Sequence, residues 1–340
     1  MKQLKKCFII AEIGVNHNND LKIAKKLVLA AKKCGADAVK FQTFKAETLA
    51  TKNTPKANYQ KTKKFNNESH YEMLKKLELS NDDHFKISKF CKKNKIEFMS
   101  TPFDLESLKF LIKLGVKSIK ISSADLTDHI IHNYLAKKKI RTIISTGMSN
   151  IDEIDQTIKI YKKYKNNKFS LLHCISNYPA SDKSLNLKNI LTLKNRYNCT
   201  VGFSDHSIGN LASLISVGLG AKIIEKHFTL NKKMEGPDHK ISCTPNEFGK
   251  LVKDIRKVEV MRGSYIKKIR EEEKEIRSIS KKSLIYNKNL KKGHSLKIGN
   301  LTSIRPGSGL LGSRINLILN KKLKKNVNKN DLVKLNDFKK

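Results

Sequence analysis

Short apolar runs alternate with amphipathic helical patterns along the first part of the chain. The eight runs span residues 7–14, 38–44, 97–103, 118–124, 142–148, 169–176, 201–207 and 222–228. Between most of them, apolar residues recur at three- and four-residue spacing, which is typical of an amphipathic helix. Strand followed by helix, repeated eight times, predicts a fold of the α/β class, a (β/α)8 TIM barrel.

Helix boundary signals support this assignment. Residues 21–35 carry a helical pattern that stops at Gly35, and a second pattern runs from Asp104, a favourable N-cap, to Gly115. The connection after the second strand, residues 45–80, is longer than the others and contains extra polar sequence. We interpret this connection as a segment that could cover a site.

The chain divides into two predicted domains. A helical pattern in "LVKDIRKVEVMRG" closes the barrel, so we expect the barrel domain at residues 1–262. Residues 263–279 are highly charged and predict an exposed linker or helix. Residues 280–340 contain short runs broken by Gly, Asn and Pro, which predicts a small β-rich domain. A unit of about 60 residues is marginally stable alone, so we expect it to pack on another surface.

Most of the predicted strands are apolar at the start and polar at the end. A TIM barrel brings the carboxyl ends of all eight strands to one face, where enzymes of this fold build their active sites. Eight converging polar ends therefore predict an active site at that face. The polar residues are Glu12, Asn16, His17, Lys40, Gln42, Ser100, Thr101, Lys120, Ser122, Ser123, Ser145, Thr146, His173, Ser204, Asp205, His206, Glu225 and His227.

Two histidines end neighbouring predicted strands. His206 and His227 occupy corresponding positions, so we expect their side chains to lie within several ångströms of each other. A lone histidine in a barrel mouth more often only donates or accepts a hydrogen bond. Two histidines in register, beside Asp205 and Glu225, favour a catalytic divalent metal whose remaining positions are filled by water or substrate.

Charged side chains at the strand ends predict an anion site. Lys40, Lys120 and Lys226 would point into the same barrel mouth, and buried ammonium groups need an anion that offsets their desolvation. Glu12 interrupts an apolar run, and it either balances a lysine or acts as a base that orients a water molecule. From the residues alone, the hypothesis is a metal-assisted enzyme that acts on a compact, doubly anionic substrate.

Composition fits a soluble globular protein of 340 residues with 39% hydrophobic and 30% charged residues. No apolar window approaches the length of a membrane span, and Glu12 interrupts the apolar N-terminal run, so we expect a cytoplasmic protein without a membrane partner. Six cysteines are scattered singly, which favours reduced thiols over a disulfide framework. Cys174 follows His173 directly, but adjacent strand residues face opposite ways, so this pair is not expected to form a nucleophile.

The net charge of +39 raises the possibility of a nucleic-acid-binding protein. However, the lysines are spread along the whole chain, without an arginine cluster or an aromatic platform for bases. We therefore expect no nucleic-acid partner, and we interpret the charge as a feature that attracts anionic small molecules.

Several motifs together carry a resemblance to a known family. The segments are "AEIGVNHNNDLKIAKKL", "AVKFQTFKAETL", "STPFD", "STGMS", "LLHCISNYP", "GFSDHS", "IEKHFTL", "EGPDHK" and "IRPGSG". In this order they resemble the sialic acid synthase family along almost the whole chain. The C-terminal unit resembles the antifreeze-like (SAF) domain that members of this family carry after their barrel.

The resemblance implies a condensation of phosphoenolpyruvate with the open-chain aldehyde of an N-acylated mannosamine-type sugar. The products are a nine-carbon 2-keto acid and phosphate. The matching histidines of related enzymes bind Mn²⁺ or Mg²⁺, so His206 and His227 are the expected metal ligands, and Glu12 matches a carboxylate near the reacting carbon. The positions that match the phosphoenolpyruvate site are Lys40, Thr101, Lys120, Ser123, Ser145 and Ser204, and those that match the sugar site are Gln42, Tyr178 and Asp238.

Assembly is also implied by the resemblance. Arg305, in "RPGSG", matches an arginine that the small domain of relatives sends into the active site of a partner subunit. The resemblance therefore implies a domain-swapped homodimer in which two chains share each active site.

Two positions depart from the family pattern. In "KISSADL", Asp125 stands at a catalytic position where a longer glutamate is usual, and Ser176 occupies the place of an asparagine or threonine. The shorter reach of Asp125 could be bridged by water, and Ser176 alters one contact to phosphate or carboxylate. Neither departure affects the metal pair or Glu12, so we expect an active enzyme.

The acceptor sugar is left open by these residues. N-acetylmannosamine, which gives N-acetylneuraminate, is the first expectation, and a 2,4-diacetamido-2,4,6-trideoxymannose, which gives N,N'-diacetyllegionaminate, is the alternative. A 3-deoxy-sugar-phosphate synthase is a weaker hypothesis, because the "RPGSG" domain argues against it. A non-enzymatic nucleic-acid-binding protein is supported by charge alone.

Overall fold

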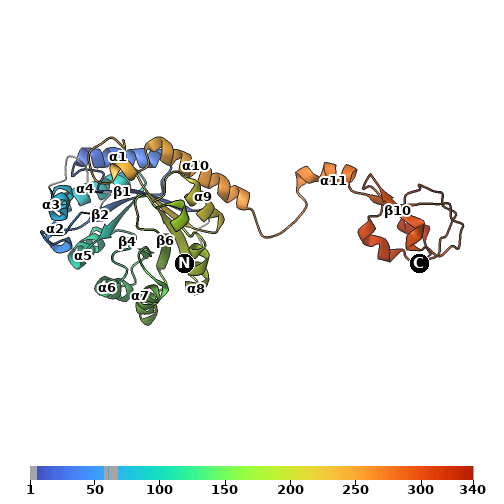
Figure 1. Cartoon of the computed structure of the whole chain (residues 1–340), viewed down its shortest axis with the longest axis horizontal. Coiled ribbons are helices and arrows are strands. Elements are labelled where there is room, and N and C mark those ends of the chain that lie inside the picture. The colour runs from blue at the N-terminus through green and yellow to red at the C-terminus, as the bar shows by residue number, and fades with distance from the viewer. Residues whose placement is uncertain (1–5, 57–59, 61–67, 340) are drawn as a thin grey trace. The chain divides into compact units, whose positions relative to one another are not determined.

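The computed structural model describes residues 6–56, 60 and 68–339 (Figure 1). Within this part of the chain, the backbone divides into two compact units, Met1–Gly263 and Ser264–Lys340. The predicted covering connection falls partly on residues 57–59 and 61–67, which lie outside the described residues. No described helix has both the length and the apolar character needed to span a membrane.

The larger unit is a closed barrel of eight parallel strands, in which β8 pairs with β1. The strands are β1 Phe8–Gly14, β2 Ala38–Thr43, β3 Glu97–Pro102, β4 Ile119–Ile121, β5 Thr142–Ser145, β6 Phe169–Cys174, β7 Thr200–Asp205 and β8 Ile223–His227. Seven predicted runs contain one of these strands, and the run 201–207 begins one residue after the start of β7, so the predicted (β/α)8 fold is confirmed.

Helices surround the barrel (Figure 1). They are α1 Leu21–Lys33, α2 Ala46–Leu49, α3 His70–Leu77, α4 Asn81–Lys93, α5 Leu105–Leu114, α6 His129–Lys137, α7 Ile151–Lys163, α8 Asn189–Tyr197, α9 Leu211–Gly218 and α10 Pro245–Arg262. The predicted signals at α5 are confirmed, because the Asp104 side chain accepts a hydrogen bond from Ser107 N and Gly115 adopts a left-handed φ of 82°. The extended connection after β2 contributes α2 and α3.

Two apolar layers build the barrel core. The outward faces of the strands pack against helices such as α1, as in the cluster that joins Ile9 and Val39 to Leu27 and Val28. A separate buried cluster consists of Ile10, Ala38, Met99, Ile143, Leu172 and Ile223. Because side chains alternate between the two faces of a strand, this second cluster is the inner layer of the barrel.

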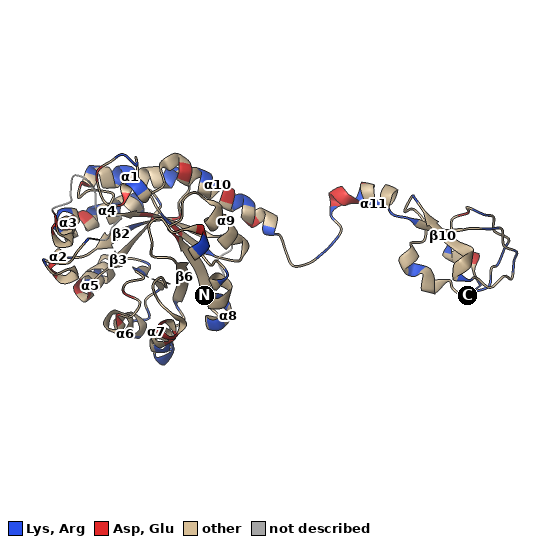
Figure 2. Cartoon of the chain, in the orientation of Figure 1, with Lys and Arg blue, Asp and Glu red and all other residues tan. Residues whose placement is uncertain are grey.

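The smaller unit has its own core. It contains α11 Lys274–Ser280 and an antiparallel pair of strands, β9 Ser283–Tyr286 and β10 Leu301–Ile304. An isolated antiparallel bridge, Ile285↔Leu332, joins β9 to a later segment. Its buried residues include Tyr286, Leu296, Ile318 and Val333. Lys and Arg are spread over the helices and loops of both units (Figure 2).

Candidate active site

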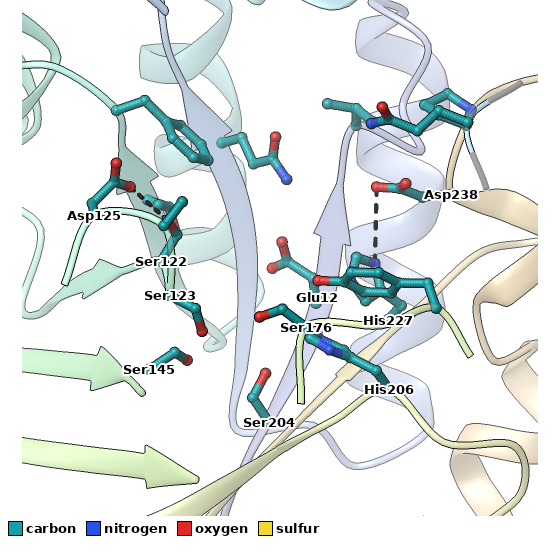
Figure 3. Close-up of a pocket in the computed structure, with 18 of the residues that line it drawn as sticks. Glu12, Ser122, Ser123, Asp125, Ser145, Ser176, Ser204, His206, His227 and Asp238 are labelled. Carbon is teal, nitrogen blue, oxygen red and sulfur yellow. Dashed lines mark hydrogen bonds and ion pairs between the residues drawn. The ribbon is translucent and has the colours of Figure 1, made fainter. Parts of the chain in front are cut away.

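A pocket of about 510 Å³ lies among side chains from the carboxyl ends of the barrel strands and the connections that follow them (Figure 3). The period of two along each strand places these side chains. Six strands carry one residue of the inner apolar layer, and the residue two positions later lines the pocket. These six pocket residues are Glu12, Lys40, Thr101, Ser145, Cys174 and Glu225.

The structure brings together every barrel residue to which the family resemblance assigned a catalytic, substrate or metal role. All of them line this one pocket, and Arg305 belongs to the C-terminal unit. The pocket residues from this set are Glu12, Lys40, Gln42, Thr101, Lys120, Ser123, Asp125, Ser145, Tyr178, Ser204, His206, His227 and Asp238.

Buried charges of opposite sign form the floor of the pocket. Lys40 Nζ lies 2.8 Å from Glu12 Oε2 and donates a hydrogen bond to Thr101 Oγ1 at 3.1 Å. These side chains are almost fully buried. Burial raises the pKa of Glu12 to about 7, although the neighbouring ammonium of Lys40 opposes this effect. The Glu12 carboxyl therefore exchanges a proton near neutral pH.

Glu225 links the two pocket lysines. Its Oε1 lies 3.6 Å from Lys120 Nζ and accepts a hydrogen bond from Ser204 Oγ at 3.1 Å, and its Oε2 lies 4.0 Å from Lys40 Nζ. The sequence analysis placed Glu225 at a polar strand end beside the two histidines but assigned it no catalytic, substrate-binding or metal-binding role. The signal that could have identified it is the period of two, since Glu225 follows the inward-facing Ile223 and pairs in register with Ser204.

Lys120 is held by oxygen atoms. Its Nζ donates to Ser145 Oγ at 2.6 Å and to the carbonyl of Ile121 at 3.0 Å. Burial lowers the pKa of Lys120, although Glu225 opposes the shift. An anion bound beside this ammonium would supply the charge that offsets its desolvation.

Lys226 does not line the pocket, so the prediction that it points into the barrel mouth is wrong. Its Nζ lies 2.8 Å from Asp205 Oδ2 and donates to the carbonyl of Ser207. Asp205 also accepts hydrogen bonds from the hydroxyls of Ser207 and Ser213. Because neighbours along a strand alternate faces, residues adjacent to pocket residues turn away from it.

The same alternation separates His173 from Cys174. His173 Nε2 donates to the carbonyl of Leu185 at 2.6 Å, away from the pocket, whereas the Cys174 thiol lines the pocket 3.7 Å from His206 Nδ1. The six cysteines are free thiols. The expectation of reduced cysteines without a disulfide framework agrees with the structure.

The two predicted metal-binding histidines are neighbours, with ring centroids 5.7 Å apart. His206 Nδ1 donates to the carbonyl of Ile175 at 2.8 Å, so the lone pair of the neutral ring lies on Nε2. His227 Nδ1 is buried, has no hydrogen-bond partner among the described residues, and lies 4.0 Å from Asp238 Oδ2 (Figure 3). Burial lowers the pKa of His227 well below its usual range, which keeps this ring neutral.

These donors fit a divalent cation. Neutral imidazole is the commonest metal ligand in proteins, and His227 Nδ1 has no hydrogen-bond partner among the described residues. The described residues contain no group of three His, Cys, Asp or Glu side chains arranged for a metal. Such a centre would therefore need oxygen ligands from water or substrate, as is typical of catalytic sites with open positions.

Further polar groups line the pocket. The centroid of the Tyr178 ring lies 4.1 Å from that of the His206 ring and 5.8 Å from that of the His227 ring, to which it is nearly perpendicular. Burial raises the pKa values of Asp125 and Asp238 to about 6. Asp125, which departs from the family pattern, accepts a hydrogen bond from Ser122 Oγ at 2.5 Å (Figure 3).

Comparison with known proteins identifies both units. The NeuB family matches residues 27–267, and the SAF domain matches residues 281–339. The N,N'-diacetyllegionaminic acid synthase of Legionella pneumophila is 47% identical over 325 residues, which cover 94% of this chain and 91% of the relative. The N,N'-diacetyllegionaminic acid synthase of Campylobacter jejuni is 43% identical over 97% of this chain and all of the relative.

A solved structure agrees with this assignment. The N-acetylneuraminic acid synthetase of Leptospira borgpetersenii, solved with citrate, superposes with a TM-score of 0.71 at 33% identity, covering 80% of this chain and 90% of that protein. The relatives extend through the barrel, the pocket residues and the C-terminal unit. The chain therefore belongs to the NeuB family of phosphoenolpyruvate-dependent sialic (nonulosonic) acid synthases and carries a C-terminal SAF domain.

Proposed function

We propose that this enzyme condenses phosphoenolpyruvate with 2,4-diacetamido-2,4,6-trideoxymannose to form N,N'-diacetyllegionaminate and phosphate. The observation that carries this proposal is the 47% identity to the Legionella pneumophila enzyme of that name, over 94% of the chain. The first expectation from sequence, N-acetylneuraminate synthase, is less well supported than this alternative. The NeuB and SAF matches also favour this class over a 3-deoxy-sugar-phosphate synthase.

A direct comparison of acceptors tests the proposal. We expect kcat/KM for phosphate release to be at least about tenfold higher with the diacetamido sugar than with N-acetylmannosamine, because a pocket discriminates sugars by the groups that it desolvates. The measurement is steady-state phosphate release with saturating phosphoenolpyruvate and each sugar in turn. A higher kcat/KM with N-acetylmannosamine would instead identify an N-acetylneuraminate synthase.

The lysine end of the pocket is suited to phosphoenolpyruvate. Lys40 and Lys120 offer two buried ammonium groups, and phosphate and carboxylate are the anions that pair best with them. Hydroxyl groups that complete this end of the site are those of Thr101, Ser123, Ser145 and Ser204.

Replacement of Lys120 by alanine is expected to raise the KM for phosphoenolpyruvate by about 10- to 100-fold, the cost of one hydrogen bond to a charged group. The KM for the sugar should change much less, because Lys120 pairs with only one of the substrates. Steady-state kinetics with each substrate varied separately gives both values. Lys117→Ala is the matched control, since Lys117 is exposed in the connection between α5 and β4, two residues before the strand that carries Lys120. An equal rise in both KM values would mean that Lys120 supports the barrel and not the anion.

We propose that His206 and His227 hold a divalent metal ion, Mn²⁺ or Mg²⁺. When bound, this ion would act as a Lewis acid that polarises the aldehyde oxygen of the open-chain sugar. The Ile175 carbonyl orients the His206 ring, and burial lowers the pKa of His227, which keeps that ring neutral. Asp238, Gln42 and Tyr178 line the same part of the pocket and are placed to bind sugar hydroxyl and amide groups.

The reaction forms one carbon–carbon bond and consumes one water molecule. C3 of phosphoenolpyruvate attacks the aldehyde carbon, and the former carbonyl oxygen takes up a proton. Water then adds to the cationic C2, and the C2–O bond to phosphate breaks, which leaves the 2-keto acid and inorganic phosphate. We propose that Glu12 accepts the proton of that water, because its pKa of about 7 suits a base at neutral pH. Lys40, 2.8 Å away, stabilises the carboxylate form.

We also propose that the enzyme is a homodimer in which Arg305 contacts the sugar bound to the partner's barrel. Arg305 is exposed directly after β10, and its loop continues through Pro306 and Gly307. Its always-charged, planar guanidinium is suited to a polar or anionic substrate group.

A further inference from the structure

One face of α3 is directed at the pocket. His70, Met73, Leu74 and Leu77 are spaced three, four and seven residues apart, so they share a face of the helix, and all four line the pocket. A capping box between Ser69 and Glu72 fixes the start of this helix. The family resemblance and the strand-end pattern assigned no role to these side chains.

Three of these residues form an apolar wall. Met73, Leu74 and Leu77 are 6–8% exposed, and they pack with Val15 and Phe44 in a cluster of their own. Leu49 and Phe103 join this wall and also line the pocket. The pocket therefore has a charged part built by the strand ends and an apolar part built largely by the insertion after β2. The charged part suits an anionic substrate, and the apolar part suits a substrate that carries methyl groups.

His70 adds one polar atom to this wall. Its Nδ1 is buried and has no hydrogen-bond partner among the described residues, while its backbone N–H donates to the carbonyl of Thr54 at 3.2 Å. A buried ring nitrogen without a partner costs free energy unless a ligand satisfies it. An apolar face with a single unsatisfied polar atom matches an acetamido group, which combines a methyl group with one amide.

We propose that α3 recognises the 4-acetamido-6-deoxy end of the acceptor sugar. Met73, Leu74 and Leu77 pack against the C6 methyl and the acetyl methyl, and His70 hydrogen-bonds the amide. N-acetylmannosamine carries hydroxyl groups at C4 and C6, and the wall would desolvate them without providing partners. This assignment rests on the proposed function and names the residues that choose between the two sugars.

The test measures kcat/KM for both sugars in wild-type enzyme, Met73→Gln and Leu74→Gln. Glutamine matches methionine in length and is one atom longer than leucine, and at both positions it places an amide in the wall. We expect kcat/KM for the diacetamido sugar to fall at least about tenfold, which is the range for one methyl group in an apolar pocket, while the value for N-acetylmannosamine changes less than about threefold. The KM for phosphoenolpyruvate should stay within about twofold, because its ligands lie on the strand ends.

Leu79→Gln is the matched control. Leu79 is 4% exposed two residues after α3, but it packs in the barrel core and does not line the pocket. The Leu79→Gln variant therefore carries the stability cost of a buried amide, which thermal unfolding measures, but it leaves the apolar wall unchanged. Its ratio of kcat/KM for the two sugars should equal the wild-type ratio.

Substitutions of His70 test the polar atom separately. His70→Ala should raise the KM for the diacetamido sugar about tenfold, and His70→Gln should recover most of that loss because its amide can reach a similar position. An unchanged sugar ratio in Met73→Gln, Leu74→Gln and His70→Ala would overturn the role of α3. That result is distinct from failure of the proposed function, which wild-type enzyme alone would reveal by preferring N-acetylmannosamine.

Discussion

Replacing His227 or His206 by alanine is expected to lower kcat/KM by more than about 100-fold. Mutation of groups that only support metal ligands already lowers metal affinity or activity by about 10- to 100-fold, and loss of a direct ligand should lower it further. The structural reason is the pair itself: the rings lie 5.7 Å apart, one nitrogen of His206 is tied to a carbonyl, and His227 Nδ1 has no partner in the described structure. We therefore expect both side chains to donate lone pairs to a metal ion in the pocket.

Metal binding gives a readout that is independent of turnover. Equilibrium dialysis with Mn²⁺ should show one tight site per chain in wild-type enzyme and greatly weakened binding in both variants. Chelation should abolish activity, and added Mn²⁺ should restore it. His129→Ala serves as the control, because His129 begins α6 outside the pocket. Full activity in excess chelator, or unchanged Mn²⁺ affinity in both variants, would contradict the assignment.

Glu12→Gln should lower kcat by about 10²- to 10⁴-fold, the usual contribution of a positioned general base. Glutamine keeps the shape of the side chain but cannot accept the proton of water. The pH dependence has a defined sign: the base must be deprotonated, so wild-type kcat/KM should fall as pH drops through about 7, the pKa of Glu12. The residual kcat/KM of the Glu12→Gln variant should not show this decrease at low pH. A Glu12→Gln enzyme that keeps both its rate and the acid limb would show that another group activates the water.

The same variant tests whether two chains share each site. Arg305→Ala and Glu12→Gln chains, each inactive alone, are co-expressed with different tags and the mixed dimers are isolated. If Arg305 acts on the partner's barrel, each mixed dimer has one intact site of two, and the purified species should show about half of wild-type activity. Mixed dimers of a wild-type chain with a chain that carries both substitutions provide the control. In these dimers the barrel that keeps Glu12 faces a partner without Arg305, so they should be inactive if Arg305 acts on the partner's barrel and about half active if it acts on its own. Mixed dimers as inactive as their parents would exclude the shared site.

Much of the active site followed from local patterns. The alternation of faces along a strand is a property of the extended backbone, so Glu12, Lys40 and Thr101 could be placed on the barrel interior from sequence. The errors arose where that alternation was not applied consistently. Lys226 was expected in the mouth, whereas its neighbour Glu225 is the residue that faces inward, and both facts follow from the inward position of Ile223.

The residues that the strand-end pattern could not assign lie on the insertion after β2. Their helical spacing predicts that His70, Met73 and Leu74 share a face, but spacing alone does not say what that face contacts. Its partners, such as Val15 and Phe44, lie 26 or more residues away and come from other elements. Only packing of the insertion against the barrel brings this apolar wall to the charged strand ends.

The sequence by itself determined the order of strands and helices, the face on which polar groups gather and the family, because periodicity, caps and motifs are local properties of the chain. Tertiary structure alone decided which charges pair, how protons are shared and where the pocket becomes apolar. The raised pKa of Glu12 and the bridge from Glu225 to two lysines depend on burial and on distances between strands far apart in sequence. Such distances exist only after the barrel closes, and burial then gives each charge an energetic weight that it lacks in water.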